Sequence, residues 1–110
     1  MEQLSPFNLI KRLEGNITSL LTPIDILDLP AKERTAVLHL KRDLVDARLD
    51  VRDYELSETR QQQLDNAQAA AKRLHQVNRY ILTASEANLF GPADVAQLSS
   101  QIEQIITNLR

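Results

Sequence analysis

Residues 31–89 contain neither glycine nor proline, although the chain has two glycines and four prolines elsewhere. These two residue types interrupt regular backbone structure most strongly, so the long stretch without them favours helix. Strict alternation of apolar and polar residues is nowhere sustained, and β-branched residues are scattered, which argues against strands. The sequence therefore predicts an all-α fold, a helical bundle in which residues 1–110 form a single domain.

Apolar residues after Pro30 recur every three or four positions, as they do on one face of an α-helix. The first row comprises Val37, Leu40, Leu44, Ala47, Val51 and Tyr54. A second row lies roughly 150° around the same helix at about 100° per residue. It comprises Leu38, Val45, Leu49 and Leu56. This helix, for which Asp28 is a candidate N-cap, is therefore expected to need apolar partners on two sides.

The same spacing continues in the second half of the stretch. Its row comprises Leu64, Ala67, Ala71, Leu74, Asn78 and Ile81, with Ala70, Val77 and Ala84 beside it. Asn78 is a polar residue in an apolar row, and such a residue often fixes helix register or oligomeric state at a cost in stability. The alternative is that the row frays at Asn78 toward the C-terminal loop.

Shorter helices are predicted at both ends of the chain. Ser5 and Pro6 suit the N-cap and the first position of a helix, and the apolar row that follows comprises Ile10, Leu13, Ile17 and Leu20. The apolar connector at residues 22–30 is expected to cover one end of the bundle. Pro92 is expected to open the last helix, which ends at Arg110 and has an apolar row of Val95, Leu98, Ile102, Ile105 and Leu109.

The stretch VRDYELSETRQQQ, residues 51–63, decides whether one long helix or two shorter helices form. Continued by sevens, the first row meets the polar residues Glu58, Asp65 and Lys72. Ser57 could also cap a new helix, and both observations favour a hairpin. The rows before and after the stretch mirror one another about residue 59, but any two heptad rows can be mirrored in this way, so the symmetry decides nothing.

The second row gives the opposite answer. On an unbroken helix it continues past Leu56 onto the side that carries Ala70 and Val77. Nothing in the stretch supplies the Gly, Asn or Pro residues that helix–helix turns usually use. We therefore predict a long central helix over about residues 31–84, with a break near 56–60 into a hairpin as the alternative.

The two readings differ in what they require of a second chain. A hairpin gives a four-helix bundle that can close on itself. A continuous helix would be about 80 Å long at 1.5 Å per residue, too long for the terminal helices to cover, and its second row would pair with another copy. We therefore predict a homodimer, whose interface comprises Leu38, Val45, Leu49, Leu56, Ala70 and Val77.

The chain carries a formal net charge of -2 and has no cysteine. Phosphate binding needs a dense excess of Lys and Arg, so the overall charge gives no case for nucleic acid. The lack of cysteine excludes disulfides and thiolate metal ligands. The first residues lack the basic start of a signal peptide, and no apolar run approaches the roughly 18 residues of a membrane span. We therefore expect a cytoplasmic protein without a cofactor and without a membrane partner.

Basic residues form a strip between the two rows of the central helix. Arg34, Lys41, Arg48 and Arg52 fall within about 40° of one another on a regular helix. One interpretation is a surface for phosphates or for an acidic partner. The other, which we favour, is that their stems lie along apolar surface and their charges pair with neighbouring helices.

Acidic residues lie on the opposite side of the same helix and comprise Asp43, Asp46, Asp50 and Asp53. With His39 one turn before Asp43, this acidic face could suggest a divalent metal. All-α proteins that hold metals with carboxylates take them from at least two helices, however, and residues 64–84 offer only Asp65. We therefore interpret the acidic face as solvated and predict neither a metal site nor a catalytic site.

The segment RTAVLH, residues 34–39, is similar to the R-x4-H pattern of the HEPN family of all-α ribonucleases. This six-residue resemblance implies a ribonuclease site that contains Arg34 and His39. On a regular helix, however, these two side chains project about 140° apart, and joint action on one phosphate requires both within reach of it. A HEPN-like ribonuclease is therefore an alternative.

The function that the sequence favours is a non-catalytic interaction or regulatory protein, a homodimer that binds itself or another protein. The first alternative is an enzyme, either a HEPN-like ribonuclease or a metal-dependent phosphohydrolase. The second alternative is a nucleic-acid-associated protein that uses the basic strip of Arg34, Lys41, Arg48 and Arg52.

Overall fold

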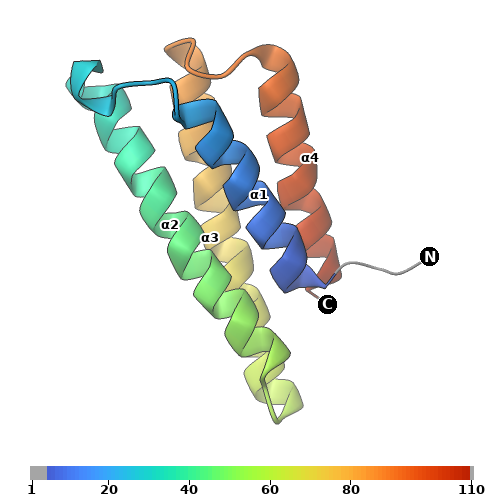
Figure 1. Ribbon diagram of the computed structural model, residues 1–110. Helices are drawn as coiled ribbons and strands as arrows, with labels where there is room; N and C mark the ends of the chain where they lie inside the picture. The colour runs from blue at the N-terminus through green and yellow to red at the C-terminus, as the bar shows by residue number, and fades with distance from the viewer. Residues whose placement is uncertain (1–4, 110) are drawn as a thin grey trace.

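The computed structural model describes residues 5–109, and these residues form an all-helical bundle, which confirms the predicted fold class. Its elements are α1 (Pro6–Leu21), a short 3-10 helix η1 (Ile26–Asp28), α2 (Ala31–Glu55), α3 (Arg60–Glu86) and α4 (Pro92–Asn108). Successive α-helices run in opposite directions, and the tip of the α2–α3 hairpin extends beyond the ends of α1 and α4 (Figure 1).

The chain turns back between α2 and α3, so the continuous helix over residues 31–84 is wrong and the hairpin is correct. The turn occupies the residues between Glu55 and Arg60, and hydroxyl groups satisfy the helix ends on both sides of it. Thr59, rather than Ser57, caps α3 and accepts a hydrogen bond from the Gln62 N–H at 3.1 Å. Such a cap satisfies a free N–H group of the first helical turn.

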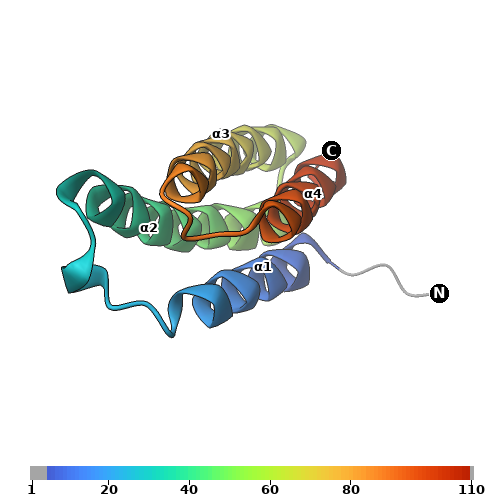
Figure 2. The ribbon, with the colours of Figure 1, turned by 90° about the horizontal axis from the view of Figure 1, so that it is seen from above.

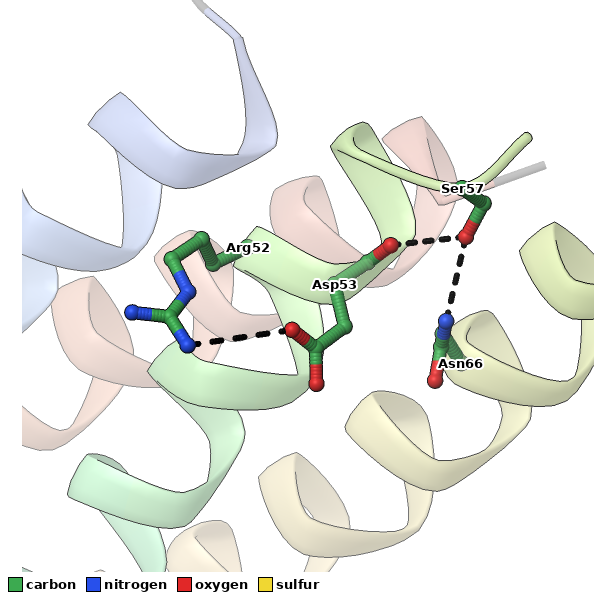
Figure 3. Close-up of polar contacts among 4 residues, drawn as sticks. All are labelled: Arg52, Asp53, Ser57 and Asn66. Atoms are coloured by element: carbon green, nitrogen blue, oxygen red, sulfur yellow. Dashed lines mark hydrogen bonds and ion pairs between the residues drawn. The ribbon is translucent and has the colours of Figure 1, made fainter.

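Ser57 has a different role, which Figure 3 shows. Its hydroxyl donates to the main-chain oxygen of Asp53 at 2.6 Å and accepts from Asn66 Nδ2 at 3.1 Å. The first bond occupies a carbonyl in the last turn of α2, and the second joins that turn to α3. Ser57 therefore ties the two helices together at the hairpin tip.

The four α-helices of the described chain surround one apolar core. Viewed along the bundle, α2 lies between α1 and α3, and α4 contacts both α3 and α1 (Figure 2). The core draws on every α-helix, and its largest fully buried side chains are Ile10, Leu13, Ile17, Leu40, Leu74, Ile81, Leu98, Ile105, Val37, Val51 and Val77. A single chain therefore encloses the first apolar row of the predicted central helix and most of the rows predicted for residues 64–84 and for the two terminal helices.

The predicted helix starts agree with the structure at both ends of the chain. Ser5 caps α1 by accepting from the Asn8 N–H at 3.2 Å, and α4 opens at Pro92. A second free N–H group of the first turn of α1 is satisfied by another helix, because Glu55 at the end of α2 accepts a hydrogen bond from the Phe7 N–H at 3.1 Å. A carboxylate at this position also suits the positive end of the helix dipole. The start of α1 is thereby fixed against the end of α2.

The connector between α1 and α2 covers one end of the bundle, as predicted. Ile24, Ile26 and Leu29 are partly buried against the core. The expected cap is wrong, because Pro30 occupies the N-cap position of α2 and its side chain cannot accept a hydrogen bond. Asp25 instead caps η1, through a hydrogen bond from the Leu27 N–H at 3.0 Å.

Asn78 forms a hydrogen bond between α3 and α4. Its Oδ1 accepts from the Ser99 hydroxyl at 2.8 Å. The row does not fray at this point, because Ile81 and Ala84 beyond it are fully buried. The last helix ends at Asn108, two residues before the predicted end, and Arg110 lies outside the described residues.

Helix α3 is followed by a residue whose backbone has the left-handed conformation. Asn88 has φ of 63°, its N–H donates to the Ser85 carbonyl, and the Leu89 N–H donates to the Ala84 carbonyl. This pair of bonds is the Schellman motif, in which Gly is the commonest left-handed residue and Asn the next. Asn88 therefore directs the chain from α3 into α4.

Asn88→Ala is expected to lower the free energy of unfolding by about 1 kcal/mol, because a residue with a Cβ and no side-chain hydrogen bond is strained in the left-handed region. Asn88→Gly is the matched control and is expected to match or exceed the parent chain. Urea unfolding measures both variants. Equal stability of the Ala and Gly variants would contradict the role given to Asn88.

Candidate functional site

The outer face of α2 carries a row of large apolar side chains that the bundle leaves uncovered. Leu38, Val45, Leu49 and Leu56 are exposed by 55%, 43%, 39% and 70%, and we call them the outer row. They lie on the side of α2 opposite the buried row that includes Leu40 and Val51. The outer row is therefore not a partly covered edge of the core but a separate apolar surface.

Ala70 and Val77 do not belong to this surface. Both are fully buried in the core of the single chain. The hairpin turn reverses α3, so the projection that placed these residues beside the outer row does not apply. Of the six residues predicted to form a dimer interface, the four on α2 and its C-cap are accessible, and the two on α3 are not.

A shallow groove of about 260 Å³ runs beside the outer row, between α1 and α2. Its lining comprises Glu14, Ile17, Thr18, Leu21, Lys41, Leu44 and Val45. Val45 belongs to both the groove and the outer row, so the groove adjoins the outer row. Glu14 is the acidic residue of the lining, and Arg48 neutralises it at 3.3 Å.

The predicted basic strip lies along the groove side of the outer row, and its members have different partners. Arg48 forms the ion pair with Glu14, and Arg52 lies 3.9 Å from Asp53 (Figure 3). Within residues 5–109, no carboxylate lies at ion-pair distance from Arg34 or Lys41. The interpretation that the strip pairs with a neighbouring helix is therefore correct for Arg48, while Arg34 and Lys41 keep their charge on the surface.

Arg42 is a further cation at the outer row that the sequence reasoning missed. It is exposed and projects about 40° from Leu38 on a regular helix, on the other side of the row from Lys41. As for Lys41, no ion pair involves it within the described part of the chain. Helical projection alone could have placed Arg42 beside the outer row, because it uses only the spacing in the sequence.

Arg73 on α3 lies beside three acidic residues of α2. Its guanidinium lies 3.6 Å from Asp43, 3.2 Å from Asp46 and 3.4 Å from Asp50. Asp43 is buried, and the side chains of Asp46 and Asp50 are mostly covered. The prediction of a solvated acidic face is therefore wrong for these three residues, which form the polar part of the α2–α3 interface.

Three carboxylates share the single cation of Arg73, and burial affects the pKa of Asp50 among them. Burial raises the pKa of Asp50, the charge of Arg73 lowers it, and the neighbouring Asp53 and Asp46 raise it, with a net upward shift. The Oδ2 atom of Asp50 is buried without a well-aligned hydrogen bond, so its 3.4 Å contact with Arg73 Nε is an attraction of charges. The cluster is thus a structural ion-pair network under strain from its excess negative charge.

His39 packs across the same interface. Its ring stacks on Tyr80 of α3, with 5.5 Å between ring centroids and 20° between ring planes. This contact assigns His39 a packing role between α2 and α3. Within residues 5–109, no group of three His, Asp or Glu side chains is arranged to hold a metal ion.

Comparisons of the chain with protein family models, with curated proteins and with solved structures give no match. None of the helices in residues 5–109 combines the length and the apolar character that crossing a membrane requires.

Arg73→Gln is expected to lower the free energy of unfolding by about 2 kcal/mol. Removing one partner of a buried ion pair costs about 3–5 kcal/mol, and the partial exposure of Arg73 reduces this effect. Arg79→Gln, an exposed cation on the same helix, is the control and should change stability by less than about 0.5 kcal/mol. Equal losses in the two variants would show that Arg73 does not hold the interface.

The pKa of Asp50 is expected to lie above the ordinary Asp value, and Arg73→Gln should raise it further because the cation favours the ionised form. A raised pKa in the folded state means that the native chain binds the proton more tightly. This group therefore stabilises the fold as pH falls through the window between the two pKa values and loses that contribution as pH rises. A carboxyl-carbon NMR titration measures the pKa, and a downward shift in either protein would contradict the assignment.

Proposed function

We propose that this chain is a non-catalytic interaction protein and that the outer face of α2 is its docking surface. The observation that carries the proposal is the outer row, in which four large apolar side chains stay exposed on one face of α2 and its C-cap, whereas the other exposed large apolar side chains, Leu27, Leu64 and Leu82, lie on separate elements or faces. Contiguous apolar surface with a polar rim is typical of sites for protein partners. A helix that lies along such a surface would contact the row at successive turns.

The hairpin changes the argument for a homodimer. A second copy was expected because a continuous central helix would leave its second row uncovered along its whole length. In the structure, α1 and α4 cover the hairpin, and one chain encloses its core. The outer row still offers a surface to a second copy, but folding no longer requires one. A homodimer is accordingly one occupant to be tested beside other proteins.

A photo-crosslinking residue at position 49 tests the docking surface in the cells that make the protein. We expect adducts at position 49 that disappear when Leu38→Ser and Leu56→Ser are added, because these changes remove the apolar row while the exposed positions keep the fold intact. The matched control places the same crosslinker at Gln97, an exposed residue of α4.

The mass of the position 49 adducts identifies the occupant, because a second copy gives twice the chain mass at every production level. A mass measurement of the purified chain over a dilution series checks the same point. Adducts that form equally at positions 49 and 97, or that persist in the Ser variants, would contradict the docking surface.

A further inference from the structure

We propose that the outer face of α2 receives an acidic amphipathic helix from another protein. This inference rests on the docking surface proposed above and specifies the chemistry of its occupant. It follows from three features of that face: the cations that have no ion-pair partner in the described part of the chain, the shape of the outer row, and the charge that a second copy would bring.

The first feature is the distribution of ion pairs around the outer row. The acidic residues nearest the row, Asp46 and Asp53, already have cations beside them, Arg73 at 3.2 Å and Arg52 at 3.9 Å. Within residues 5–109, Arg34, Lys41 and Arg42 have no such partner. On a regular helix these three cations project within about 60° of the row, on both of its sides. The docking face therefore presents apolar side chains between uncompensated positive charges.

The second feature is the length and shape of the face. The outer row runs from Leu38 to Leu56, which is about 27 Å at a rise of 1.5 Å per residue. A helix of about five turns matches this length. The α1–α2 groove lies beside Val45, but its lining residues Ile17, Leu21 and Leu44 are themselves buried, so the outer row supplies the apolar contact. An amphipathic helix can therefore lie along the row, beside the groove, with its flanking residues near Lys41 and Arg42.

The third feature argues against a second copy. In an antiparallel pair of α2 helices about a two-fold axis, each edge of the row meets the same edge of the partner. Lys41 and Arg52 share one edge, so on that edge they would face the same cations of the other copy, whereas on the other edge Arg42 would face Asp53. Like charges placed opposite one another across an interface oppose binding, while opposite charges favour it. Carboxylates flanking the row of a foreign helix would instead pair with these cations.

The test uses three synthetic peptides of about 18 residues that share one apolar row and carry Glu, Gln or Lys at the flanking positions. We expect the Glu peptide to bind most tightly and the Lys peptide least, with NMR shifts confined to the outer face of α2 and the α1–α2 groove. The affinity of the Glu peptide should fall as salt rises, because exposed charge pairs are screened.

Two variants and one control separate charge from apolar contact. Lys41→Gln with Arg42→Gln should weaken the Glu peptide about fivefold, as expected for the loss of two surface ion pairs, and should leave the Gln peptide unchanged. Leu38→Ser with Leu49→Ser should weaken both peptides. Lys72→Gln with Arg79→Gln removes two exposed cations of α3 and should change neither.

Each other outcome overturns the inference in a distinguishable way. Equal binding of the Glu and Gln peptides would reject the acidic partner but would still support the proposed docking surface. A doubled chain mass that depends on Leu49, without peptide binding, would assign the face to a second copy. Binding of vesicles of mixed phosphatidylcholine and phosphatidylserine in preference to all peptides would assign it to a lipid surface. The absence of all binding, together with failed crosslinking at position 49, would reject the proposed function itself.

Discussion

The reversal of the chain between Glu55 and Arg60 is the constraint on which the rest of the structure depends. It brings α2 and α3 together over almost their whole length, and this pair makes the most extensive helix–helix contact of the bundle. Because α3 returns along α2, Ala70 and Val77 enter the core, and α1 and α4 need only cover one side of the hairpin. The opposite side of α2 is left to solvent with its apolar row exposed. The exposed outer row is thus a direct consequence of the turn.

The polar contacts between α2 and α3 set how the hairpin is aligned. Arg73 meets three aspartates, His39 stacks on Tyr80, and Ser57 binds Asn66 near the tip. A buried ion-pair network of this kind contributes little net stability, since the desolvation of its charges offsets their attraction. Its effect is on register, because a shift of one turn would leave the buried Asp43 without its cation. The network also engages Asp43, Asp46 and Asp50, and among residues 5–109 no carboxylate lies at ion-pair distance from Lys41 or Arg42 on the outer face.

Local sequence signals predicted the helices and the starts of α1 and α4, because the Ser5 hydroxyl caps its own first turn and Pro6 and Pro92 suit the first helical position. They did not predict the turn, since Ser57 and Thr59 close it with side-chain hydroxyls and the stretch has no Gly, Asn or Pro. Because the turn was not predicted, Ala70 and Val77 were assigned to the wrong surface. The role of Arg73 was also missed, because its partners depend on how α3 is aligned against α2. The mirror about residue 59 was in fact informative: His39 with Tyr80 and Asp46 with Arg73 are pairs centred close to it.

The distance between the start of α2 and the end of α3, at the open end of the hairpin, tests this account most directly. The chain has no cysteine, so Lys32→Cys and Glu86→Cys allow two spin labels to be attached at exposed positions of α2 and α3. Helices in contact have axes about 8–10 Å apart, so the account predicts a short distance between the labels, which persists when labelled protein is diluted with unlabelled protein. A continuous helix would separate the same positions by about 80 Å at 1.5 Å per residue. A distance in that range, or a short one that vanishes on dilution, would contradict the closed hairpin.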